Sequence, residues 1–232
     1  MNFQEQKNIN SEELAKWNDE MVLKHHKNGT LFESKNPLVR LISKMRLKKL
    51  IKCANLNEND VVLDLGCGEG FLISFLPPVK KVIGIDISKV ALKRAGEILR
   101  NKTNVQLLWG DAQNINLADE SFDKIFCSET LEHLPEPHRA TKEIYRLLKK
   151  GGMAIISIPD EKRSKLIMKI AKLFLLDRFL HTARKEVDYD WHLHQADKKF
   201  IFEITKNLFN VKKIYRVPPF IGNTFVAVLE KQ

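Results

Sequence analysis

Short apolar runs that recur between helix-like segments constrain the fold of this chain more than any other feature. Each run is apolar over nearly its whole length, which is typical of strands in a parallel sheet covered by helices on both faces. Two later runs, Val211–Val217 and Thr224–Leu229, are joined by a short turn, so we expect them to pair antiparallel. The sequence therefore predicts an α/β fold with a mostly parallel sheet. The earlier runs are Val61–Leu65, Val82–Ile85, Val105–Leu108, Lys124–Cys127 and Met153–Ile158.

Helices between these runs can be placed from capping residues and helix breakers. Serine and asparagine favour the position just before a helix, proline favours its first turn, and glycine ends it. The expected helices are 11–27 capped by Ser11, 37–54 capped by Asn36, 89–100 capped by Ser88, 138–150 ended by Gly151 and Gly152, and 198–207.

The charge and the cysteine content limit the possible partners and the cellular compartment of this protein. The chain has 39 basic and 29 acidic residues, which gives a net charge of +10. This balance fits an anionic partner, such as nucleic acid or an anionic membrane surface, and it equally fits a lysine-rich solvated surface. The cysteines, Cys53, Cys67 and Cys127, are too few for a disulfide framework, so a cytoplasmic protein is expected. No uncharged apolar run of about 18 residues is present, so we expect no membrane span.

A glycine-rich loop, Asp64–Gly70, follows the first apolar run. Glycines permit a positive φ and let the backbone approach a ligand closely. Phe71 stands where the dinucleotide-binding pattern has its third glycine, which disfavours a nicotinamide dehydrogenase. Asp86 ends the second run, where a carboxylate can bind ribose hydroxyls, and Asp111 follows the third run, where it could accept a hydrogen bond from an adenine. Carboxylates suit a ligand with sulfonium and ammonium groups better than a pyrophosphate.

Several segments resemble the successive motifs of the class I S-adenosylmethionine-dependent methyltransferases. The resemblance covers about Val61–Pro159 and is closest to the type 11 methyltransferase group that contains the ubiquinone and menaquinone pathway enzymes. It implies a Rossmann-like seven-stranded sheet with an antiparallel last strand, and S-adenosyl-L-methionine as the cofactor. The segments are Val61–Leu72, Gly84–Ser88, Gly110–Ala112, Ser121–Ile125 and Leu147–Ile158.

The same resemblance assigns roles to individual residues. It implies that Asp64 and Gly66 hold the methionine portion of the cofactor and that Asp86 holds the ribose. Ile87, Asp111 and Ala112 would contact the adenine, and Ser128 would line the methyl-transfer site. The remaining loop residues expected at the cofactor are Cys67, Gly68 and Gly70.

The chain is expected to form a single methyltransferase domain over residues 1–232, a length that fits one α/β unit. Residues 59–159 would form the cofactor-binding core. An N-terminal helical cap (1–58), a helical insert or lid (160–197), and a C-terminal helix with a β-hairpin (198–232) would surround it.

The run Glu129–His133 follows the fourth strand, at the edge where ligands bind in open α/β sheets. Three interpretations remain open. Glu129 or His133 could act as a general base on the acceptor. Glu129, Glu132 and His133 could bind a divalent cation, with His192 or His194, as in some ubiquinone-pathway and small-RNA methyltransferases that this run resembles. The run could instead be structural.

The segment 163–180 reads as a basic amphipathic helix, with Lys165, Lys169 and Lys172 on one face. Such a helix can pack over the pocket of its own domain as a lid, or it can lie in a membrane interface as a peripheral contact. The two uses are compatible if the substrate is a lipid. Asp188–His194, His25 and His26 are further candidates to reach the active site.

These features predict a methyltransferase that acts on a small-molecule or lipid-like acceptor at oxygen, nitrogen or carbon. An RNA or protein methyltransferase is an alternative that the positive charge favours, although no nucleic-acid-binding module is recognisable. A non-catalytic adenosylmethionine-binding subunit of a partner enzyme is a second alternative. The acceptor, the oligomeric state and the presence of a metal stay open at this stage.

Overall fold

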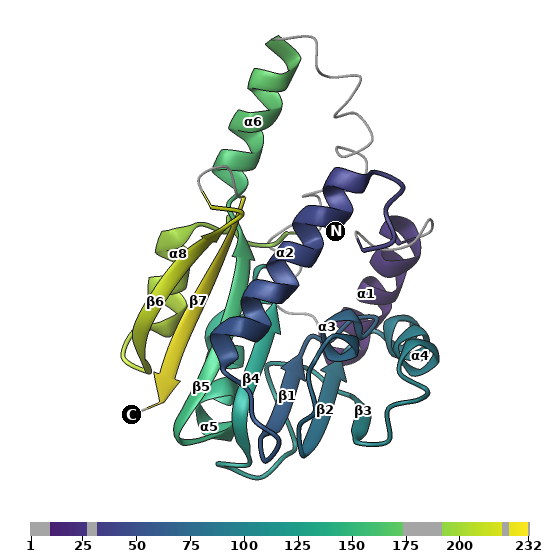
Figure 1. Ribbon diagram of the computed structural model, residues 1–232, viewed down its shortest axis with the longest axis vertical. Coiled ribbons are helices and arrows are strands. Elements are labelled where there is room, and N and C mark those ends of the chain that lie inside the picture. The colour runs from purple at the N-terminus through teal and green to yellow at the C-terminus, as the bar shows by residue number, and fades with distance from the viewer. Residues whose placement is uncertain (1–9, 27–31, 174–191, 220–222, 232) are drawn as a thin grey trace.

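The computed structural model describes residues 10–26, 32–173, 192–219 and 223–231. Within these residues the chain forms one seven-stranded sheet in the order β3-β2-β1-β4-β5-β7-β6 (Figure 1). All neighbouring strands are parallel except at β7, which runs antiparallel to both β5 and β6. The expected α/β sheet and its antiparallel last strand are therefore confirmed. The strands are β1 (Val61–Leu65), β2 (Lys81–Asp86), β3 (Val105–Trp109), β4 (Phe122–Ser128), β5 (Leu148–Pro159), β6 (Phe209–Val217) and β7 (Thr224–Lys231).

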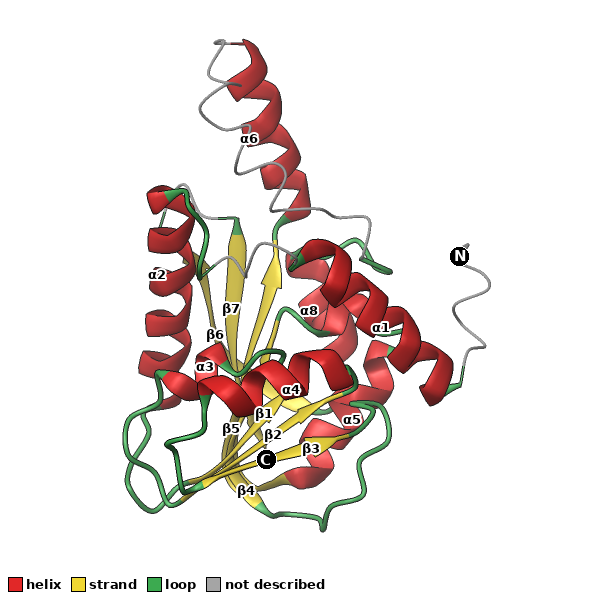
Figure 2. Ribbon diagram, turned by 90° about the vertical axis from the view of Figure 1, so that its right-hand side faces the viewer, coloured by secondary structure: helices red, strands yellow, loops and turns green. Residues whose placement is uncertain are grey.

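Helices cover both faces of the sheet, as Figure 2 shows. Neighbouring residues of a strand point to opposite faces, so Val62 and Leu63 of β1 belong to two separate cores. One core packs against α2, α3 and α4, and the other packs against α5 and α8. The helices are α1 (Ser11–His25), α2 (Pro37–Ala54), α3 (Phe71–Ser74), α4 (Lys89–Ile98), α5 (Pro137–Leu147), α6 (Glu161–Leu173) and α8 (Lys198–Thr205).

The strand order alone indicates where a ligand would bind. After β1 the chain first adds β2 and β3 on one side of that strand, and it then returns to add β4 and β5 on the other side. Crossover helices leave a crevice at such a switch point, outside the carboxyl ends of the strands. The glycine loop, Asp86, Asp111 and the Glu129–His133 run all follow strands that end at this edge.

Several expected helix boundaries are wrong: α4 ends at Ile98 and α8 at Thr205, two residues early, and contacts explain two further cases. Helix α5 ends at Leu147 instead of Lys150, and Gly151 and Gly152 lie inside β5. Leu148 is fully buried and pairs with Phe122 of β4, so tertiary pairing ends the helix before the glycines do. Asn10, not Ser11, caps α1, because its side chain accepts hydrogen bonds from the first helical turn.

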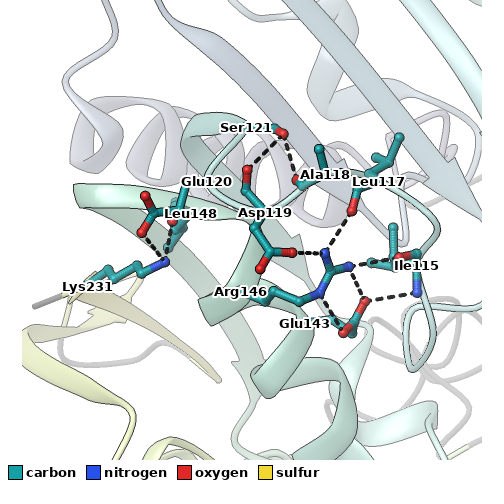
Figure 3. Close-up of polar contacts among 10 residues, drawn as sticks. All are labelled: Ile115, Leu117, Ala118, Asp119, Glu120, Ser121, Glu143, Arg146, Leu148 and Lys231. Atoms are coloured by element: carbon teal, nitrogen blue, oxygen red, sulfur yellow. Dashed lines mark hydrogen bonds and ion pairs between the residues drawn. The ribbon is translucent and has the colours of Figure 1, made fainter.

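An arginine on α5 fixes the loop that joins Asp111 to β4 (Figure 3). The guanidinium of Arg146 donates to the carboxylates of Glu143 and Asp119 and to the carbonyls of Leu117 and Ile115. The two carboxylates raise the pKa of Arg146. The loop is thus held by one side chain bound at several points, which positions the residues that follow Asp111.

Among the described residues, no helix is both long enough and apolar enough to cross a bilayer.

Candidate active site

The glycine loop is tied to the end of β2. The backbone N–H groups of Gly66 and Cys67 both donate to the carbonyl of Ile85 (2.8 and 3.0 Å). Gly66 has a φ of +74°, and a Cβ at this position would lie 2.3 Å from Oγ1 of Thr130. Only glycine therefore fits there. Gly70 packs against Leu99 instead, where a Cβ would lie 2.7 Å from Cδ1.

One cavity of about 270 Å³ lies at this edge of the sheet. Of the residues expected to bind the cofactor or to act as catalytic groups, Gly70 is the one that is not part of its lining; the further candidates Glu132, His25, His192 and His194 are also outside it. The structure thus brings the expected cofactor residues and the acceptor-side pair into one space. The expected residues that line the cavity are Asp64, Gly66, Cys67, Gly68, Asp86, Ile87, Asp111, Ala112, Ser128, Glu129 and His133.

Asp64 is the least satisfied group on the cofactor side. Its side chain is buried, and Oδ2 has no hydrogen-bond partner. Burial, with a further contribution from the charge of Asp86, raises the pKa of Asp64 to about 7. A buried carboxylate oxygen without a donor favours a cation beside it.

Asp86 is held by the backbone on both sides. The N–H of Gly68 donates to Oδ2 (2.7 Å), and the N–H of Ser88 donates to Oδ1 (2.8 Å). Burial raises the pKa of Asp86, and these hydrogen bonds act in the opposite direction. The carboxylate is therefore fixed in orientation at the end of β2.

Helix α1, part of the expected N-terminal cap, covers this side of the site through polar residues that the sequence alone did not indicate. Ser11 Oγ donates to Oδ2 of Asp111 (3.0 Å), and Asp19 Oδ1 accepts from Ser88 Oγ (2.6 Å). Asn18 and Val22 of the same helix line the cavity. No local pattern marks these polar residues, because their partners lie about 70 to 100 positions away in the sequence.

The last turn of α1 is also held at the glycine loop. His26 lines the cavity, and its Nδ1 lies 3.1 Å from Oε1 of Glu69. The same oxygen accepts a hydrogen bond from Arg94 of α4 (2.6 Å). Burial alone would raise the pKa of Glu69, but these two partners lower it below its ordinary value.

Glu129 also lines the cavity, and its φ is +51°. Its carboxylate forms an ion pair with Arg46 of α2 and accepts a hydrogen bond from Oγ1 of Thr224 on β7 (3.2 Å). Arg46 was not expected at the site. The signal that could have found it is its position four residues before the buried Leu50, on the inward side of an otherwise apolar stripe.

Two aromatic rings lie beside this ion pair. The rings of Phe32 and Phe71 stack at 5.0 Å, and the guanidinium of Arg46 lies 5.8 Å from the centre of the Phe32 ring. All three side chains line the cavity. This part of the lining thus combines a charged pair with a flat apolar surface.

Glu132, unlike Glu129, does not line the cavity. It lies in the 3₁₀ turn Leu131–His133, outside the cavity lining, and neither of its carboxylate oxygens has a hydrogen-bond partner. Burial, and then the charge of Glu129, raise the pKa of Glu132 well above its ordinary value. Its Oε1 lies 4.0 Å from Nε2 of His133.

His192 approaches the same group from the segment before α8. The rings of His133 and His192 lie 4.8 Å apart, and Nδ1 of His192 donates to Oε1 of Glu161 (2.9 Å). The ligand atoms of Glu132, His133 and His192 lie within 4.8 Å of one another, so these three could hold a metal ion. Glu129 is not in this group. His194 lies apart from it, with Nε2 2.9 Å from the carbonyl of Leu134, and residues 188–191 lie outside the described part.

The buried cysteines carry no sign of a nucleophile. Burial raises the pKa of the Cys67 and Cys127 thiols, so both are neutral near pH 7. Cys67 fills space beside Gly84, where a Cβ would lie 3.0 Å from its sulfur.

Comparisons with known proteins agree with this geometry. Residues 63–156 match the family model described as a methyltransferase domain. The chain is 31% identical over 160 residues to the demethylmenaquinone methyltransferase of Staphylococcus carnosus, which covers 62% of this chain and 63% of that protein. It is 30% identical over 172 residues to the protein of the same name from Staphylococcus saprophyticus, covering 70% and 73%.

A solved structure shares the fold over nearly the whole length. The N-methyltransferase NodS of Bradyrhizobium japonicum, in complex with S-adenosylhomocysteine, superposes with a TM-score of 0.63 at 16% identity, covering 99% of this chain and 96% of that one. The aligned part spans less than two thirds of the S. carnosus relative but 73% of the S. saprophyticus relative. With its motifs, its sheet topology and these relatives in agreement, this chain belongs to the class I S-adenosylmethionine-dependent methyltransferase family.

Proposed function

We propose that this protein transfers a methyl group from S-adenosyl-L-methionine to a small-molecule or lipid-like acceptor. The observation that carries the proposal is one cavity lined both by three carboxylates at strand ends, Asp64, Asp86 and Asp111, and by Glu129 and His133. The relatives named demethylmenaquinone methyltransferase support a lipid-like acceptor, since a menaquinone is a lipid.

The residues on the cofactor side fit the proposed ligand. The unpartnered oxygen of Asp64 suits the ammonium group of the methionine portion, and Asp86 is oriented to accept from ribose hydroxyls. Ile87, Asp111 and Ala112 would border the adenine, and Gly66, Cys67, Gly68 and Ser128 would lie along the rest of the ligand. When bound, S-adenosylmethionine supplies an electrophilic methyl group on a sulfonium; the protein supplies alignment and excludes water.

At the acceptor end, we assign acid–base work to Glu129 and His133. Both line the cavity, whereas Glu132 does not. The ion pair with Arg46 orients Glu129, and Thr224 donates a hydrogen bond to its second oxygen. His133 is 17% exposed and lies next to a second imidazole, so it can receive a proton from the acceptor and pass it outward.

A divalent cation at Glu132, His133 and His192 is a second proposal for the same region. The two orphaned oxygens of Glu132 support it, as does Glu161, which orients the His192 ring through Nδ1. Metal analysis of the purified protein and titration with Mn²⁺ or Zn²⁺ test it directly. Binding that Glu132→Gln abolishes and Glu136→Gln preserves is expected; no metal uptake by the wild type would remove the proposal.

A peripheral membrane contact through 163–180 is part of the proposal as well. Helix α6 covers its first part, up to Leu173, and residues 174–180 lie outside the described part of the chain. The exposed cations of α6 support such a contact.

Thermal unfolding in the presence of separate ligands tests the cofactor first. A ligand at about 100 times its dissociation constant stabilises a protein by roughly 2.7 kcal/mol, which corresponds to about 5–11 °C for a domain of this size. Adenosylmethionine and adenosylhomocysteine should both shift the transition, and NAD should not. A shift with NAD alone would refute the proposal.

Turnover separates the remaining alternatives. Transfer of a labelled methyl group to a component of a lipid extract is the expected result. Labelling of RNA or protein alone would favour those acceptors, and cofactor binding without labelling of any fraction would favour a non-catalytic partner subunit.

A further inference from the structure

The net charge of this chain lies on two helices. Helices α2 and α6 together hold 11 of the 39 basic residues and one of the 29 acidic residues. The rest of the chain therefore holds 28 basic and 28 acidic residues and is neutral. The +10 charge is thus a local feature and not a general property of the surface.

Helix α2 presents leucines and cations side by side near its N-terminus. Leu38 is 43% exposed and Leu41 is 55% exposed, and the exposed Arg40 and Lys44 lie among them. Within the described part of the chain, neither Arg40 nor Lys44 forms an ion pair. The sequence of α2 contains no acidic and no aromatic residue.

Helix α6 carries the same combination. It projects beyond the carboxyl edge of the sheet, and among the described elements no helix or strand packs along it (Figures 1 and 2). Leu166 is 55% exposed, and Lys165 and Lys169 are exposed beside it. Its one acidic residue, Glu161, is buried at the root of the helix and bound by His192 and Lys165.

These two surfaces lie at the same end of the molecule. In both views the N-terminus of α2 and the whole of α6 stand at the edge of the sheet where the strands point (Figures 1 and 2). The cavity lies at that edge, and Arg46, on the inner side of α2, lines it. We call the exposed group of Leu38, Arg40, Leu41, Lys44, Lys165, Leu166 and Lys169 the basic rim.

We propose that the basic rim docks on an anionic lipid bilayer. Exposed leucines interspersed with cations on projecting helices can enter the headgroup region while the cations bind anionic lipids. A single-stranded nucleic acid would instead be expected to use aromatic stacking platforms, and neither helix has an aromatic residue. The surface stands independently of methyl transfer, whereas its use in presenting an acceptor to the cavity rests on the proposed function.

Co-sedimentation of the full chain with phosphatidylcholine vesicles, with and without phosphatidylglycerol, tests the proposal. The wild type should bind only the anionic vesicles and should be released at high salt. Each basic side chain near such a surface contributes about fivefold to binding, so Arg40→Gln with Lys44→Gln should weaken it about 20- to 30-fold. Leu41→Ser with Leu166→Ser should weaken it at least about tenfold.

Matched variants control for charge and for apolar exposure in general. Lys80→Gln with Lys81→Gln removes the same charge from exposed positions where β2 begins, at the opposite edge of the sheet. Phe75→Ser removes a side chain that is 51% exposed and lies outside the rim. Both controls should leave vesicle binding unchanged.

Several outcomes would overturn the basic rim as a lipid surface. These are no binding of the wild type to anionic vesicles, equal losses in the control variants, or binding to poly-glutamate with no vesicle binding, which would assign the surface to an acidic protein. The thermal shift with adenosylhomocysteine is measured on every variant. Vesicle binding by the wild type without that shift would refute the cofactor proposal and leave the basic rim proposal standing. A thermal shift without vesicle binding would refute the basic rim proposal and leave the cofactor proposal standing.

Discussion

Replacing Asp64 with asparagine should stabilise the ligand-free protein, and the gain should grow with pH. The pKa of Asp64 is raised to about 7, whereas an unfolded aspartate titrates near pH 3.9. A raised pKa leaves stability intact below about pH 4 and lowers it as pH rises toward 7, because the buried carboxylate must ionise. Linkage gives a loss of roughly 1.5 kcal/mol at pH 5 and about 4 kcal/mol at pH 8.

Asparagine has nearly the same shape and does not ionise, so its advantage over the wild type should grow by about 2.5 kcal/mol between pH 5 and pH 8. For a chain of this length that corresponds to a melting-temperature difference that widens by about 5–10 °C. Thermal unfolding of both proteins without ligand at the two pH values measures it. The same variant should bind adenosylhomocysteine more weakly, because an amide cannot balance an ammonium charge.

Asp123→Asn is the matched control for this experiment. Lys149 and the N–H of Val61 lower the pKa of Asp123 although burial opposes them, so this carboxylate titrates below about pH 4 in both states. Its removal should change stability by a similar amount at pH 5 and pH 8. If Asp64→Asn and the wild type show parallel pH dependence, the assignment of a raised pKa to Asp64 is wrong.

Three further substitutions test the architecture around the site. Gly66→Ala should lower the free energy of unfolding by about 1–3 kcal/mol and abolish the adenosylhomocysteine shift, because its Cβ would meet Thr130 at 2.3 Å. Gly68→Ala, which has open space at its Cβ, should lower the free energy of unfolding less, and equal melting curves for the two variants would contradict this. Asp19→Ala should speed release of adenosylhomocysteine by about tenfold in stopped-flow measurements, since α1 loses an anchor, and Asp19→Asn should restore part of the effect. Arg146→Met should lower the free energy of unfolding by about 1–3 kcal/mol in a denaturant titration, and a loss no larger than for an exposed lysine of α5 would show that the loop does not depend on it.

The placement of the strand-end aspartates in one cavity could be predicted because it follows from local patterns. Parallel strands end at a common edge, so the positions of Asp64, Asp86 and Asp111 follow once the apolar runs are recognised. The partners of Glu129 could not be predicted in this way. Arg46 and Thr224 meet Glu129 from positions 83 and 95 residues away, and a single polar residue carries no periodic signal.

The same distinction explains the misplaced helix end. A glycine pair is a reliable local breaker, and the sequence predicts the end of α5 there. The helix ends earlier because Leu148 is buried against β4, and this pairing depends on a strand about 25 residues upstream. Gly151 then adopts a φ of +73° within β5, a conformation that suits glycine in a strand.

The origin of the partners of Glu129 and His133 has an evolutionary consequence. The matched methyltransferase domain spans residues 63–156, but Arg46, His192 and Thr224 come from outside it. Under the proposed function, a lineage can exchange the segments that meet the acceptor while residues 63–156 keep the cofactor framework. Relatives that share the central domain are expected to share an acceptor only when they also share these three residues. These residues are therefore the first to compare when the substrate of one family member is assigned to another.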